Sequence, residues 1–83
     1  MIYYIQATIR GKERSDNLQP ETIGKRLVQL RGNRTQAEVA RAVGVSDSAL
    51  SSYECGERIP RDSIKIKIAE FYGETVQSIF FDN

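Results

Sequence analysis

Residues Thr35 to Glu57 place strict limits on the fold of this chain, because they read as two short helices joined by a tight turn. Thr35 and Glu38 have the spacing of a capping box, in which the two side chains close the N-terminus of a helix. Gly44 marks the end of that helix, where the backbone must enter a left-handed conformation. Ser46 is the natural N-cap of the helix that follows.

Apolar residues at helical spacing predict three more short helices. The first begins near Glu21 and ends at Gly32, another begins near Asp62, and the last is capped by Thr75. Residues 64–68 alternate between Ile and Lys as a strand would, but the longer apolar pattern around them has helical spacing. We therefore expect an all-α domain of five short helices.

The first ten residues follow a different pattern. Residues 2–10 are rich in β-branched and aromatic side chains, and from Ile5 onward apolar and polar residues alternate. This is typical of a strand with one face to bury. The chain is thus divided into a short N-terminal β arm with a linker, residues 1–20, and a helical domain, residues 21–83.

A strand without a partner strand is unstable alone, so we expect residues 2–10 to pair with the same segment of a second copy. The alternatives are a disordered extension or a strand laid on its own domain. A competing dimer surface is the C-terminal edge around Phe81. Each alternative stays open at the level of the sequence.

The composition argues against catalysis and against a metal site. The chain has no histidine and a single cysteine, Cys55, which removes the commonest general base and the usual zinc ligands. We expect no cofactor, no metal and no enzyme. No apolar run approaches the roughly 18 residues of a membrane span, and no secretory signal precedes the domain, so a cytoplasmic protein is expected.

At this point the residues match a known family. The matching motifs are Ile23-Gly24…Leu30-Arg31, Thr35-Gln36-Ala37-Glu38-Val39-Ala40, Gly44-Val45-Ser46, Leu50-Ser51-Ser52-Tyr53-Glu54 and Gly56…Pro60…Ile68-Ala69. Residues 23–80 resemble the Cro/C1-type (XRE-type) helix-turn-helix domain of phage repressors. The resemblance implies a five-helix, lambda-repressor-like DNA-binding domain whose third helix enters the major groove.

The resemblance also assigns roles to individual residues. Positions matching Asp47, Ser48 and Ser52 commonly touch base edges, and an aspartate there can accept a hydrogen bond from a cytosine amino group. Phosphate contacts are implied for Gln36, at the start of a helix, and for Ser46 and Ser51. Arg31 and Glu54 match a structural ion pair. The plainer alternative is that the serines and the aspartate form a solvated polar face.

The charge of the chain is modest for a DNA-binding protein. The formal net charge is +1, although residues 1–34 hold seven Lys or Arg against three acidic residues. The predicted recognition helix carries no positive charge of its own. We therefore expect a local basic rim that positions the domain on the DNA backbone, formed by Arg34, Arg58, Arg61 and Lys65.

These expectations point to a sequence-specific regulator of transcription that binds double-stranded DNA. Repression is favoured over activation, because occupancy alone blocks a promoter. A homodimer on a palindromic operator is expected. Two alternatives remain: the DNA-binding antitoxin of a toxin–antitoxin pair, and a protein-interaction module that keeps the fold but not DNA binding.

Overall fold

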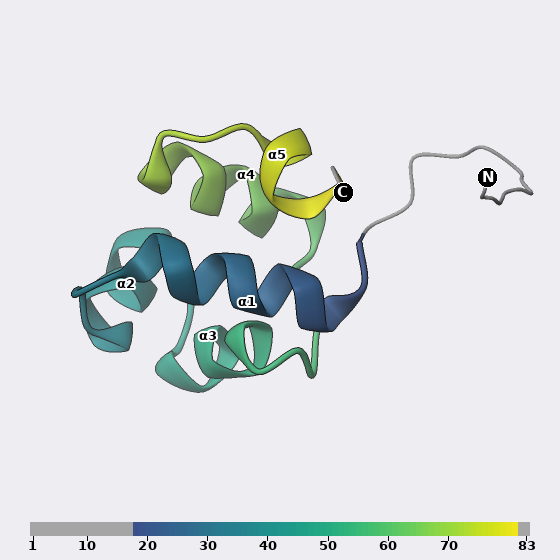
Figure 1. The fold of residues 1–83 in the computed structure, drawn as a ribbon. Coiled ribbons are helices and arrows are strands. Elements are labelled where there is room, and N and C mark those ends of the chain that lie inside the picture. The colour runs from purple at the N-terminus through teal and green to yellow at the C-terminus, as the bar shows by residue number, and fades with distance from the viewer. Residues whose placement is uncertain (1–17, 82–83) are drawn as a thin grey trace, which may run out of the picture.

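The computed structural model describes residues 18–81, and five helices follow one another in this part of the chain. They are α1 (Pro20–Arg31), α2 (Gln36–Val43), α3 (Asp47–Glu54), α4 (Asp62–Tyr72) and α5 (Val76–Phe80) (Figure 1). The all-α class is confirmed. α1 begins one residue before the predicted start, because a proline suits the first turn, where its missing N–H is not needed. The strand predicted for residues 2–10 lies outside the described residues.

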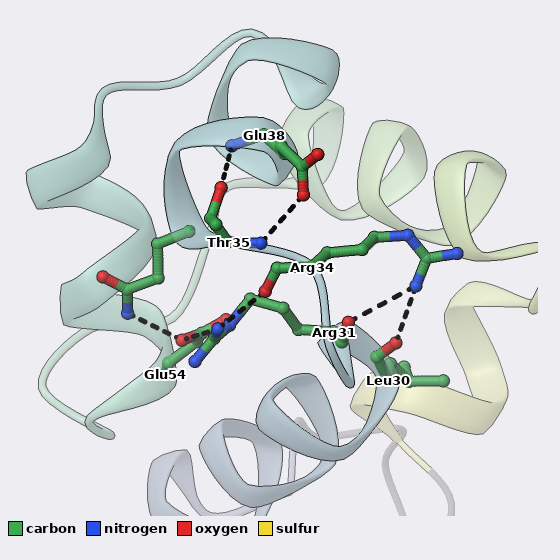
Figure 2. Close-up of polar contacts among 7 residues, drawn as sticks. Leu30, Arg31, Arg34, Thr35, Glu38 and Glu54 are labelled. Carbon is green, nitrogen blue, oxygen red and sulfur yellow. Dashed lines mark hydrogen bonds and ion pairs between the residues drawn. The ribbon is translucent and has the colours of Figure 1, made fainter.

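Side chains and glycines set the helix ends where the sequence predicts them. Thr35 Oγ1 accepts a hydrogen bond from the Glu38 backbone N–H at 3.1 Å, and the Glu38 carboxylate accepts one from the Thr35 N–H at 2.9 Å (Figure 2). Ser46 and Thr75 likewise cap α3 and α5 with their hydroxyls. Gly44 has φ = 89°, so the turn between α2 and α3 uses the left-handed region that glycine enters without strain.

The core lies around α1, which runs between α3 on one side and α4 with α5 on the other (Figure 1). All five helices contribute side chains that are almost fully shielded from solvent. Leu18, which precedes α1, joins them. These residues are Leu18, Ile23, Leu27, Val39, Ala40, Val43, Leu50, Tyr53, Ile68, Ala69, Ile79 and Phe80.

The close approach of α1 and α3 depends on a glycine. A Cβ atom built on Gly24 would overlap the backbone carbonyl oxygen of Glu54 and lie only 3.1 Å from that of Tyr53. Real Cβ contacts are wider than this, so any other residue at position 24 must push α3 away from α1. Gly24 therefore sets the distance at which α3 is held.

The short α5 is fixed to α1 by an arginine. Arg26 Nη1 donates a hydrogen bond of 2.7 Å to the backbone carbonyl of Ser78 and one of 3.3 Å to that of Ile79. Carbonyls in the last turn of a helix have no partner within the helix. Arg26 therefore satisfies the C-terminal end of α5 and ties two segments that lie far apart in the sequence.

The first prediction concerns Gly24→Ala. It should lower the free energy of unfolding by about 1–3 kcal/mol, because overpacking forces α3 outward even though alanine favours a helix. Urea denaturation measures the change. Lys25→Ala, an exposed change in the same helix, is the control and should stay within about 0.5 kcal/mol. A Gly24→Ala variant as stable as the parent would show that the contact with α3 is not tight.

Candidate nucleic-acid interface

The outward face of α3 is small and polar. Asp47 and Ser48 are exposed, while Ser51 and Ser52 are half-buried near the same surface. Leu50 and its neighbour Tyr53 point inward and anchor the helix in the core. Within residues 18–81 the side chains of the outward group make no hydrogen bond. The helix thus presents donors and acceptors that the fold itself does not use.

Ser46 stands at the N-terminal end of this face. Its hydroxyl oxygen accepts a hydrogen bond from the Ala49 backbone N–H at 3.0 Å, so the side chain is a helix cap. The hydroxyl is exposed, and its own O–H remains available as a donor. The structure therefore gives Ser46 a definite structural role and leaves room for the expected phosphate contact.

The carboxylate of Glu54, at the end of α3, binds two other helices (Figure 2). Arg31 Nε of α1 donates to both of its oxygens, at 3.2 Å to Oε1 and 2.9 Å to Oε2. Gln36 Nε2 of α2 donates to Oε1 at 2.8 Å. Glu54 is only 8% exposed, so these bonds compensate the burial of its charge. Arg31, Glu54 and Gln36 form what we call the Glu54 network.

The Glu54 network orients the amide of Gln36. One of its two amide N–H groups is taken by Glu54, and the other has no partner within residues 18–81. Gln36 is also the first residue of α2, where backbone N–H groups lack partners in the helix and the helix dipole favours an anion. The end of α2 therefore offers a preoriented side-chain donor beside backbone donors.

A tyrosine that the sequence did not single out lies next to this network. The hydroxyl of Tyr72 is buried without a hydrogen-bond partner in the described part of the chain. Burial raises the pKa of the phenol above its ordinary value, and the Glu54 carboxylate raises it further, whereas Arg34 and Arg31 lower it. The phenol is therefore held in its neutral form next to a buried charge.

The arginines predicted for the basic rim are placed in different ways. Arg34 is exposed, but its guanidinium lies over the rings of Phe71 (5.4 Å) and Tyr72 (5.9 Å) and donates to the carbonyl of Leu30 at the end of α1. Figure 2 shows it pointing away from Glu54. The positive charge of Arg34 therefore lies against the C-terminal end of α4, away from the Glu54 carboxylate.

Two other arginines lie in the loop between α3 and α4. Arg58 is exposed, four residues after the end of α3, with its guanidinium 5.5 Å from the centre of the Tyr53 ring. Arg61 is exposed at the N-cap position of α4. These two follow α3 most closely in the chain and supply positive charge that α3 lacks.

Lys65 does not belong to the rim. It is only 5% exposed, its ammonium lies 3.4 Å from Asp62 Oδ1, and it faces the rings of Phe80 and Phe81 at 5.8 and 5.1 Å. The expectation of an exposed lysine is wrong because this residue lies on the inward side of α4, against α5. The Ile-Lys alternation of residues 64–68 did not show which lysine turns inward.

The comparison with protein families settles the class. A family model described as helix-turn-helix matches residues 25–79, which is well over half of the chain. The chain belongs to the Cro/C1-type helix-turn-helix family. It is accordingly a DNA-binding regulator of transcription, built on the helix pair α2 and α3.

A solved structure supports the same assignment. The crystal structure of the clp gene regulator ClgR from Corynebacterium glutamicum is similar to this Cro/C1-type domain with a TM-score of 0.67 and 26% sequence identity. The match covers 75% of this chain and 68% of that one. No curated protein matches the sequence.

Two further features of the described residues bear on the site. No group of three or more His, Cys, Asp or Glu side chains in that part of the chain is arranged to hold a metal ion. None of the helices found between residues 18 and 81 is long and apolar enough to cross a membrane. Cys55 is exposed at the C-terminal end of α3.

The second prediction tests the Glu54 network. Glu54→Ala should lower the free energy of unfolding by about 2–3 kcal/mol, because it leaves the Arg31 guanidinium and the Gln36 amide without their shared acceptor. Chemical denaturation measures this loss. Glu57→Ala removes an exposed glutamate three residues later and is the matched control. Equal stability of the two variants would contradict a structural role for the network.

The third prediction concerns pH. The raised pKa of Tyr72 means that its phenol ionises more readily in the unfolded chain, so its contribution is complete below pH 10.0 and is lost as the pH rises through the higher folded value. Tyr72→Phe should therefore weaken the alkaline loss of stability. At neutral pH it should add about 1 kcal/mol, since a buried unpaired hydroxyl is removed.

Urea denaturation at neutral pH and above pH 10.0 measures both effects. Tyr53→Phe changes the other tyrosine of the described residues and is the control for loss of a phenol. If Tyr72→Phe destabilises the domain at neutral pH, the hydroxyl has a partner that the structure does not show.

Proposed function

We propose that this chain is a sequence-specific transcriptional repressor that binds a palindromic DNA operator as a homodimer. The observation that carries the proposal is the outward face of α3, whose polar groups have no bond within residues 18–81 although the same helix is firmly anchored beneath. A helix held in this way fits the major groove, where base edges offer complementary donors and acceptors.

The base-reading residues in this proposal are Asp47, Ser48 and Ser52. Asp47 is exposed in the first turn of α3 and accepts a hydrogen bond from a cytosine amino group. The two serines pair with more than one base, so they add contact but little discrimination. Direct readout by so few groups means that DNA shape contributes to the choice of site.

The phosphate contacts come from groups beside α3. Gln36, with its amide oriented by Glu54, binds one phosphate together with the N-terminus of α2. Ser46, Ser51, Arg58 and Arg61 contact the backbone nearby, and Arg34 contributes from its place against α4. These bonds set the position of the domain and carry no sequence information themselves.

The homodimer is proposed on the sequence of residues 2–10, which pair with their counterparts across a two-fold axis. Two copies related in this way match two half-sites about one helical turn apart. Repression follows from occupancy, because a bound dimer excludes polymerase from a promoter. The setting is the cytoplasm. The chain itself does no chemistry in this proposal and needs no cofactor.

The fourth prediction is the result of operator selection from randomised duplex DNA at two salt concentrations. The full chain should enrich a palindrome, and its affinity should fall steeply with salt as phosphate contacts release counterions. Weak binding at low salt without enrichment would overturn the proposal. It would favour a protein-interaction module, in agreement with the serine-rich face of α3, which carries no positive charge.

Two variants then distinguish residues that contact base edges from residues that contact the phosphate backbone. Asp47→Ala should relax the preference at one or two base pairs, whereas Gln36→Ala should weaken binding to all sequences by a similar factor. Gln29→Ala, an exposed glutamine on α1, is the matched control and should change neither. An unchanged base preference in Asp47→Ala would remove Asp47 from the reading set.

A further inference from the structure

A shallow apolar groove lies between α4 and α5. It has a volume of about 400 Å³ and is lined by Asp62, Lys65, Ile66, Val76 and Phe81. Ile66 is 50% exposed, and with Val28 of α1 it is one of two large exposed hydrophobic side chains among the described residues. Contiguous apolar surface that is bordered by polar residues is a more specific mark of a docking site than an apolar side chain exposed alone.

Lys65 makes the groove unusual. Its side chain is 6% exposed, yet within residues 18–81 its ammonium makes one hydrogen bond, of 3.4 Å, to an Asp62 side chain that is almost fully in solvent. An ammonium has three donors, and a buried charge is costly unless its donors are satisfied. The Phe80 and Phe81 rings supply only part of the compensation. Carbonyl oxygens of a segment that lies in the groove would accept hydrogen bonds from the remaining donors of the Lys65 ammonium.

Leu18, the first residue that the structure describes, lies beside the end of α5 that borders the groove. The backbone N–H of Leu18 donates to the carbonyl of Phe80 at 2.8 Å, and Phe80 precedes the groove residue Phe81. Residues 11–17 span at most about 25 Å when extended. Residues 2–10 are consequently within reach of the groove without any change in the helical domain.

We propose that residues 2–10 occupy the groove between α4 and α5. Their alternating apolar residues, Ile5, Ala7 and Ile9, pack on Ile66, Val76 and Phe81, and their backbone carbonyls accept the remaining hydrogen bonds of Lys65. The polar face of the segment, which includes Gln6 and Thr8, is turned to solvent.

This inference rests on the homodimer proposed above and completes it. A two-stranded ribbon is only marginally stable by itself and gains stability by packing against helices. The two-fold axis of an antiparallel ribbon is perpendicular to it, so the apolar faces of both strands lie on the same side. The ribbon thus covers one groove from each copy, and the two domains are held together through α4 and α5 while α3 stays available.

The fifth prediction uses tryptophan fluorescence, because the chain has no tryptophan of its own. In full-length protein, Ile5→Trp should emit at the shorter wavelength of a buried indole, and Gln6→Trp, on the opposite face of the segment, should emit as an exposed one. Adding Ile66→Glu should shift the Ile5→Trp emission to that of an exposed indole. The same change should weaken dimerisation about tenfold, since it removes one buried isoleucine and leaves a charge in its place.

Val28→Glu is the matched control, because Val28 is the other exposed large hydrophobic residue and lies on α1, outside the groove. It should change neither the emission nor the dimer. Ile66 is half exposed, so its replacement is compatible with folding, and circular dichroism verifies this. Lys65→Met gives an independent test: it removes the donor that requires carbonyl partners and should also alter the Ile5→Trp emission.

An exposed indole in Ile5→Trp together with an intact dimer would overturn the inference, because the segment would then lie outside the groove. Equal effects of Ile66→Glu and Val28→Glu would overturn it as well. Failure of the proposed function is seen separately: a chain that enriches no operator while Ile5→Trp stays buried lacks the proposed DNA specificity but keeps the docked segment.

Discussion

The carboxylate of Glu54 is the interaction on which the arrangement of the first three helices depends. It sits at the end of α3, receives both a guanidinium from α1 and an amide from α2, and is nearly closed to solvent. Because Gly24 allows α1 to touch the backbone at the same point, the charge is reached by short side-chain bonds. Polar and steric constraints therefore meet at one residue and fix the orientation of α3.

Much of the fold follows from local signals in the sequence. The capping pair Thr35 and Glu38, the cap Ser46 and the left-handed Gly44 predicted helix ends that the structure confirms. These signals depend on residues close together in the sequence, so they predict the helix ends without knowledge of the fold. The Arg31–Glu54 pair came from resemblance to a family, since its partners are far apart in the chain.

Features that depend on packing between helices could not be predicted from the sequence. The expectation for Lys65 was wrong because an Ile-Lys alternation has no unique inward face until α5 is in place. The unpaired hydroxyl of Tyr72 and the bonds from Arg26 to the end of α5 likewise depend on distant segments. For the outward side chains of α3, sequence and structure agree on exposure, and which of them touch DNA remains a prediction.

The separation between the two faces of α3 has a consequence for how such a regulator changes over time. The inward face and Glu54 hold the helix, whereas the side chains of Asp47 and Ser48 make no hydrogen bond within residues 18–81. Exchange of the outward residues therefore costs little stability. In the function proposed above, a few substitutions at these positions would change the target site without an intermediate that folds poorly, so the choice of DNA site can diverge faster than the core.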